Sequence, residues 1–315
     1  MKPLIWIRTS RRGCFPAAAA ILLAVITWWI MSGWPLSLHL LRFYPKRLAS
    51  SASGWLAQRT VPTWARGTLI GGFARHYAVD LDEAEFPVEA YPSLQAFFTR
   101  RLKPGFRPQA EMTPGAINSP VDARLIASGR IEADTAIQAK GLPYRITELL
   151  KHDPEARRFE GGRYLTLYLS PKDYHRIHVP LNGQVTAVGR VEGELWPVNE
   201  ASTTHVPRLY ERNRRATWVS TGTGPDEGLE VAAILVGATH VGGVIIDDRW
   251  LEGRTLPQDG EFPVKKLPCH PGEDLGTFRF GSTVILLIGG PKASQWEPAM
   301  TEGAVKVGQR LGAFQ

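Results

Sequence analysis

The chain has 315 residues, of which 43% are hydrophobic and 21% are charged, and its formal net charge is +7. This composition supplies enough apolar side chains for a buried core and excludes a wholly disordered chain. Two cysteines, Cys14 and Cys269, exclude a disulfide framework and a multi-cysteine zinc site. The positive charge alone is typical of a nucleic-acid-binding protein, so its position along the chain matters.

The positive charge belongs to the N-terminal quarter. Residues 1–79 contain ten Lys or Arg and no Asp or Glu, whereas the rest of the chain is slightly acidic. Residues 15–34 form an apolar stretch with three tryptophans and basic flanks, which predicts a membrane-embedded helix, spanning or re-entrant. A cleaved signal peptide and an organellar targeting segment are the alternatives. Because basic residues flank both sides, the charges give no orientation.

Residues 41–75 remain basic and aromatic, which suits helices on an anionic lipid surface, although a solvated helical linker has the same composition. We therefore expect a membrane-anchoring helical region at 1–65 and a further helical segment at 66–112. In that segment Asp80 or Asp82 is expected to cap one short helix. Ser93 is expected to cap a second helix that turns Leu94, Phe97 and Phe98 inward.

The body of the chain, 113–315, is dominated by strand patterns. Apolar or alternating runs bounded by Gly, Pro and Asn predict strands at 163–170, 174–180, 183–191, 229–237, 241–247 and 283–289, and one helix at 144–151. The chain has no dinucleotide, P-loop or HExxH motif. We expect an α+β protein in which N-terminal membrane-associated helices precede a mainly antiparallel β catalytic domain.

Three short segments carry residues suited to chemistry. They are Ser119-Pro120-Val121-Asp122, the run 173–178 that holds His175 and His178, and 280–283 that holds Ser282. Taken singly, each has an ordinary structural interpretation: a turn-capping aspartate, structural histidines and a tight turn. Taken together, Asp122, His178 and Ser282 could form a triad, since a triad is defined by geometry and not by chain order. Ser282 lacks the GxSxG elbow of an α/β-hydrolase.

The sequence resembles the membrane-associated, pyruvoyl-dependent phosphatidylserine decarboxylases. The resemblance extends from about residue 74 to the C-terminus and rests on seven segments in the family's order: AINSPVDARL (116–125), AKGLPYRITELL (139–150), YLSPKDYHRIHVPLNGQV (168–185), LWPVNE (195–200), PRLYERNRR (207–215), VAAILVGATHVGGV (231–244) and EDLGTFRFGSTVILLI (273–288).

The resemblance implies a proenzyme that cuts itself between Gly281 and Ser282. The products would be a β chain, 1–281, and an α chain, 282–315, whose first residue, Ser282, becomes a pyruvoyl group. That group would form a Schiff base with phosphatidylserine and yield phosphatidylethanolamine and CO₂, with no metal or nucleotide. By the same resemblance His178 is the base for cleavage, Asp122 orients it, and His175 is the general acid of decarboxylation.

The implied setting is the cytoplasmic face of a bacterial plasma membrane, with the mitochondrial inner membrane as the alternative. Its expected partners are phosphatidylserine in an anionic membrane and a second copy of the chain, and not nucleic acid. A membrane-bound serine hydrolase using the same three residues, and a scaffold that no longer processes itself, are the competing hypotheses.

The sequence departs from the family pattern at three positions. Phe280 replaces the usual Leu before the scissile pair, Ala123 replaces a Gly, and Arg214 replaces a Glu. The first affects the fit of the side chain before the cut, the second restricts a turn, and the third removes or rearranges any ion pair built on that Glu.

Overall fold

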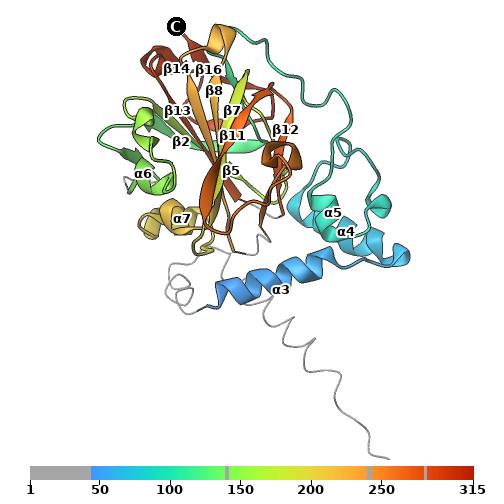
Figure 1. The fold of residues 1–315 in the computed structure, drawn as a ribbon. Coiled ribbons are helices and arrows are strands. Elements are labelled where there is room, and N and C mark those ends of the chain that lie inside the picture. The colour runs from blue at the N-terminus through green and yellow to red at the C-terminus, as the bar shows by residue number, and fades with distance from the viewer. Residues whose placement is uncertain (1–43, 139–141, 240–242, 280–281) are drawn as a thin grey trace, which may run out of the picture.

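The computed structural model describes residues 44–138, 142–239, 243–279 and 282–315. Three helical elements come first and lie outside the β body: α3 (Lys46–Gln58), α4 (Thr63–Tyr77) and α5 (Leu94–Phe98). Figure 1 shows α3 running across the lower end of the β body, with α4 and α5 beside it. The short helices within the body are α6 (Ile146–Leu149), α7 (Glu200–His205) and α8 (Leu209–Arg212).

An eight-stranded sheet organises the body, and every pair of neighbouring strands in it is antiparallel. Its order is β11 (Gly260–Cys269), β7 (Gly183–Val191), β8 (Arg215–Gly222), β9 (Glu230–Val236), β13 (Ser282–Gly289), β5 (Arg163–Leu169), β2 (Ala123–Arg130) and β15 (Gly303–Val305). Strand β13 therefore lies inside the sheet, between β9 and β5.

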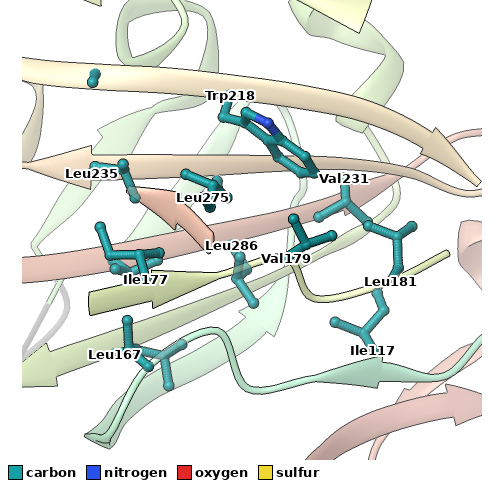
Figure 2. Packing of buried hydrophobic residues seen from close by; sticks show 14 of the residues in the cluster. Ile117, Leu167, Ile177, Val179, Leu181, Trp218, Val231, Leu235, Leu275 and Leu286 are labelled. Carbon is teal, nitrogen blue, oxygen red and sulfur yellow. The ribbon is translucent and has the colours of Figure 1, made fainter. Parts of the chain in front are cut away.

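Both faces of this sheet are covered, which explains the uninterrupted apolar sequence of β13. Its side chains alternate between two buried clusters, with Val284 and Leu286 in one and Ile285 and Leu287 in the other. Figure 2 shows the first cluster, where Leu286 and Leu235 lie among side chains from several strands, and Trp218 belongs to the same cluster. All eight residues of β13 are buried.

A smaller sheet packs against the face of the large sheet that carries Val284 and Leu286. It consists of β10 (Val244–Ile246), β12 (Asp274–Phe278) and β6 (Arg176–His178), and it contributes Ile177, Leu275 and Phe278 to the first cluster. The other short strands form one three-stranded and one two-stranded sheet: β1 (Ile117–Asn118), β16 (Arg310–Phe314) and β14 (Trp296–Pro298), then β3 (Thr135–Ile137) and β4 (Pro143–Arg145). The predicted mainly antiparallel α+β class is confirmed.

The predicted elements compare unevenly with this fold. The strand at 183–191 is found with those bounds, and Ser93 caps α5, accepting a hydrogen bond from the Ala96 amide. Phe97 and Phe98 are fully buried, as expected, whereas Leu94 is only partly buried. The prediction that Asp80 caps a helix is wrong. Its carboxylate accepts a hydrogen bond from the Asp82 amide, and the residues that follow form a turn and not a helix.

Other differences concern helix lengths and the membrane segment. The helix expected at 144–151 shrinks to α6 because 143–145 form β4 instead. The predicted membrane-embedded helix at 15–34 lies outside the described residues. Among the residues that are described, no helix is both long and apolar enough to cross a bilayer.

Candidate active site

Ser282 is the first residue of β13, where it pairs with Leu169 of β5. Its side chain is fully buried, and its Oγ has no hydrogen-bond partner among the described residues. By the alternation of the strand, Ser282 lies on the same face as Val284 and Leu286, the face covered by β6 and β12. An unpaired buried hydroxyl costs free energy, and its lack of a partner leaves Ser282 Oγ available for a reaction. Gly281 lies outside the described residues.

His175 is completely buried just before β6. Its Nδ1 donates to the Asp173 carbonyl at 2.8 Å, which leaves the lone pair on Nε2, and Nε2 has no partner within the described chain. Burial lowers the pKa of His175 to about 3, and the nearby positive charge of Arg100 acts in the same direction. The ring lies 4.0 Å from that of Phe98, centroid to centroid, so α5 covers it. His175 is therefore a neutral imidazole with a free acceptor nitrogen.

His178 meets a different environment at the end of β6. Its Nδ1 donates to the Gly272 carbonyl at 2.9 Å, and its Nε2 faces the Tyr174 hydroxyl at 3.3 Å. Burial lowers the pKa of His178, although the Gly272 carbonyl and the carboxylate of Asp274 oppose the shift. The Asp274 oxygen lies 3.6 Å from Nδ1. His178 is thus neutral, with Nε2 as its basic atom.

The carboxylate of Asp122 forms neither a hydrogen bond nor an ion pair with the His178 ring in the described structure. Its carboxylate accepts two hydrogen bonds from Arg107 Nε, at 2.8 and 3.0 Å, and one from the Val307 amide at 2.9 Å. The link to His178 runs through the backbone, since the His178 amide donates to the carbonyl of Pro120 at 2.8 Å. The 119–122 and 173–178 segments therefore meet, and the ladders bring the third segment close, since Tyr168 of β5 pairs with Thr283 on one side and with Arg124 on the other. Among the described residues, Asp274 is the carboxylate that lies within ion-pair distance of the His178 ring.

Sequence reasoning missed Asp274, Arg107 and Tyr174 as neighbours of the predicted site. Asp274 stands within the 273–288 segment and faces His178 through the pairing of β12 with β6. Tyr174 directly precedes His175, and burial raises its pKa to about 12, so it faces His178 as a neutral hydroxyl. The sequence pointed to Asp274 and Tyr174 only through their closeness to the predicted site residues. No local sequence pattern pointed to Arg107.

The structure explains two of the three positions at which the sequence departs from the family pattern. Ala123 begins β2 outside the left-handed backbone region, so the position does not need Gly. Arg214 forms its own ion pair, with Glu192 at 2.7 Å. Phe280 lies outside the described residues. The described residues contain no group of three or more His, Cys, Asp or Glu side chains placed to hold a metal ion.

The structure is that of an antiparallel β protein with a buried serine at the head of an internal strand, and a small sheet beside two neutral histidines packs against the same face of the large sheet. The profile of the phosphatidylserine decarboxylase family matches residues 94–313. The phosphatidylserine decarboxylase proenzymes of Coxiella burnetii and of Anaeromyxobacter sp. (strain K) are each 41% identical to this chain over 283 residues. These matches cover 86% of this chain and 95% and 96% of the relatives.

The proenzyme of Myxococcus xanthus is 37% identical over 285 residues, which cover 88% of this chain and 98% of the relative. The chain belongs to the phosphatidylserine decarboxylase family.

Proposed function

We propose that this chain decarboxylates phosphatidylserine to phosphatidylethanolamine and CO₂ after cutting itself between Gly281 and Ser282. The observation that carries the proposal is the buried, unpartnered Ser282 hydroxyl at the first position of β13. Family membership supports the same conclusion. The serine hydrolase and the processing-dead scaffold are not favoured, because the related proteins are named as decarboxylase proenzymes.

The described residues fit a pyruvoyl group derived from Ser282. Two buried polar atoms at this site, Ser282 Oγ and His175 Nε2, have no partner in the described chain and so remain available to such a group and to its substrate. A pyruvoyl group supplies an electron sink for decarboxylation, as pyridoxal phosphate does elsewhere.

In self-cleavage, Ser282 is the nucleophile and needs a base to take its proton. His178 suits this role because it is neutral and carries its lone pair on Nε2. Asp274, 3.6 Å from Nδ1, would stabilise the imidazolium that forms, and the charge of Asp122 acts in the same direction from farther away. We propose Asp122 chiefly as a positioning residue, since it holds Arg107 and the Val307 amide beside the 118–122 segment.

In decarboxylation, the protonation state of His175 matters. A neutral His175 cannot donate a proton from Nε2 until it has accepted one. The substrate amine arrives as an ammonium ion and must lose a proton before it can act as a nucleophile. We propose that His175 takes this proton and returns one to the carbon that has lost CO₂, so that the proton count balances.

The cleavage step is tested by intact mass spectrometry of Ser282→Ala, which we expect to remain a single uncut chain. Ser128→Ala is the matched control, because Ser128 lies on β2 and its hydroxyl binds the Thr301 carbonyl. The control should yield two chains, with a pyruvoyl group on the downstream one. A Ser282→Ala chain still cut between 281 and 282 would refute self-cleavage at Ser282.

The two histidines are separated by comparing cleavage with CO₂ release. We expect His178→Ala to stay uncut, and His175→Ala to be cut but to release CO₂ at least a hundredfold more slowly. His152→Ala is the control, since that side chain pairs with Asp259 at the surface. Full decarboxylation by His175→Ala would remove its proposed role.

We further propose that the protein works at the cytoplasmic face of a bacterial plasma membrane, anchored by residues 1–65. The helical segment 66–112 and the catalytic domain 113–315 would follow it. The described part of the anchoring region supports this proposal: α3 exposes Leu48, Trp55 and Leu56 to solvent, and residues 44–79 contain five basic and no acidic residues. A homodimer remains a prediction that size measurement in detergent can test.

A further inference from the structure

A cavity of about 440 Å³ lies between the large sheet and β10. Its charged lining residues are five arginines and, within the described chain, a single carboxylate: Arg190, Arg214, Arg215, Arg254, Arg279 and Asp248. A concave site with such an excess of guanidinium groups favours an anionic ligand.

Two of these arginines already have their hydrogen bonds satisfied by the protein. Arg215 is buried and donates to the carbonyls of Leu149 at 2.7 Å and Glu211 at 2.6 Å. Arg254 is paired with Glu252 at 2.5 Å. These two side chains therefore support the cavity wall and are poor candidates for ligand binding.

Arg190 and Arg214 are different. The side chain of Arg190, on β7, makes no hydrogen bond or ion pair within the described chain. The side chain of Arg214 pairs with Glu192, which also pairs with Arg47, and the buried Nε of Arg214 has no hydrogen-bond partner among described residues. Burial lowers the pKa of Arg190, and the charge of Arg214 lowers it further. Two cations that repel each other in a half-buried cavity would gain from an anion between them.

The cavity lies at the same end of the sheet as Ser282. The register aligns Arg215 of β8 with Val236 of β9, and Val236 with Thr283 of β13. Two strand spacings, roughly 10 Å, therefore separate the Arg215 row of β8 from the start of β13, and Arg190, on β7, lies one spacing farther away, at roughly 14 Å. The long arginine side chains span part of this distance, which leaves room for a ligand whose anionic group lies between the arginines and the start of β13.

A second hollow of about 330 Å³ leads from this cavity to α3. The two share Leu195, Arg214 and Arg279, and the second is otherwise lined by one side of α3, including Ser51 and Trp55. Trp55 is 59% exposed. The arginine cavity is thus connected to the helix that we propose to lie on lipid.

We propose that Arg190 and Arg214 form the binding site for the phosphate of the substrate phospholipid. The inference rests on the proposed function and identifies the part of the substrate that these two side chains recognise. The shared chemistry is a phosphate ester, which could come from the lipid headgroup or from a soluble metabolite, and we commit to the lipid. Guanidinium groups suit this task because they bind phosphate oxygens with paired, charge-assisted hydrogen bonds.

The test compares Arg190→Gln and Arg214→Gln with Arg124→Gln, a control that removes an exposed β2 arginine paired with Glu302. The substrate is monomeric dihexanoyl phosphatidylserine. We expect each cavity variant to raise KM about tenfold, with kcat within twofold of wild type and self-cleavage complete. Arg190→Lys should recover part of the loss, because it keeps the charge without the paired geometry.

A binding measurement keeps the site testable without activity. Calorimetry with sn-glycerol 3-phosphate on the uncut Ser282→Ala chain should show about tenfold weaker binding when Arg190 or Arg214 is also changed to Gln, and no change with Arg124→Gln. Unchanged KM and unchanged binding would overturn the proposal. Weaker binding with an unchanged KM would also overturn it, because the cavity would then take a soluble phosphate ester. If the wild type released no CO₂, the proposed function would fail while calorimetry still decided the phosphate site.

Discussion

His175 and His178 are three residues apart, yet each imidazole meets its own surroundings. His175 faces the aromatic ring of Phe98 and forms no ion pair with a carboxylate of the described residues, whereas His178 has an Asp274 oxygen 3.6 Å from its Nδ1. Both rings are neutral because burial lowers both pKa values. The difference that matters is the ease of forming an imidazolium, which Asp274 favours at His178. This contrast supports assigning the base of self-cleavage to His178.

The buried neutral His175 has a consequence for stability in acid. Its folded pKa, about 3, is below the ordinary value of 6.5, so between these values only the unfolded chain binds the proton. Stability contributed by His175 is therefore present above pH 6.5 and is lost as the pH falls toward 3. Between pH 7 and pH 5 we expect the Ser282→Ala chain to lose about 2 kcal/mol more unfolding free energy than the same chain carrying His175→Asn.

Urea unfolding of the two chains at both pH values measures this difference. The Ser282→Ala background keeps one uncut chain in each sample, and the contribution of His178 cancels in the comparison. An identical loss in the two chains would show that His175 takes up its proton as readily in the folded as in the unfolded state.

At the scale of elements, β13 determines how the two products of the proposed cleavage would stay together. It forms complete antiparallel ladders with β5 on one side and β9 on the other, and both partners belong to the upstream product. Its side chains enter both buried clusters of the body. Residues 282–315, the proposed downstream product, therefore contribute a central strand to the sheet, and cleavage before Ser282 would remove none of these ladder contacts.

We accordingly expect the cut chains to remain associated through gel filtration at nanomolar concentration and to separate only in denaturant. Leu286→Ala should weaken this association by 2–5 kcal/mol, roughly the cost of such a truncation in a packed core. Lys306→Ala, a downstream change at an exposed side chain, is the control. Dissociation of the wild-type chains on dilution would contradict the expectation.

Local patterns predicted some elements and could not predict others. The regular alternation of β7 and the apolar run of β13 carry their own signal. Strand β11 contains Pro263 and Pro268, and proline usually argues against a strand. The sheet accommodates these prolines because β11 lies at its edge. The pairing of Asp122 with Arg107 likewise depends on where the fold places the 103–108 connector, and no local sequence pattern predicts that placement.

At the scale of the whole molecule, we propose that the helices outside the β body bring the site to lipid. Leu56 of α3 and Trp64 of α4 are 63% and 86% exposed, which favours burial in an interface when the protein meets a bilayer. We expect Leu56→Gln and Trp64→Gln to lower CO₂ release from phosphatidylserine vesicles about tenfold while leaving the rate on dihexanoyl phosphatidylserine within twofold of wild type.

Phe106→Gln is the control for this prediction, since Phe106 is also exposed but lies in the connector beyond α5. The ratio of the two rates, measured on the full-length processed enzyme, separates access to lipid from chemistry. Equal losses on vesicles and on the monomeric substrate would place these two side chains in the fold instead of at the membrane.

The position of β13 inside the sheet also affects whether the protein can refold after the proposed cleavage. The intact precursor brings this strand between β5 and β9 as part of one chain, so closing the loop costs only intramolecular entropy. Once the bond before Ser282 is broken, an unfolded enzyme must recover its sheet by an encounter between two separate molecules, at a rate set by their concentration. We therefore expect the cut protein to keep its structure through slow unfolding, and to refold poorly after complete denaturation.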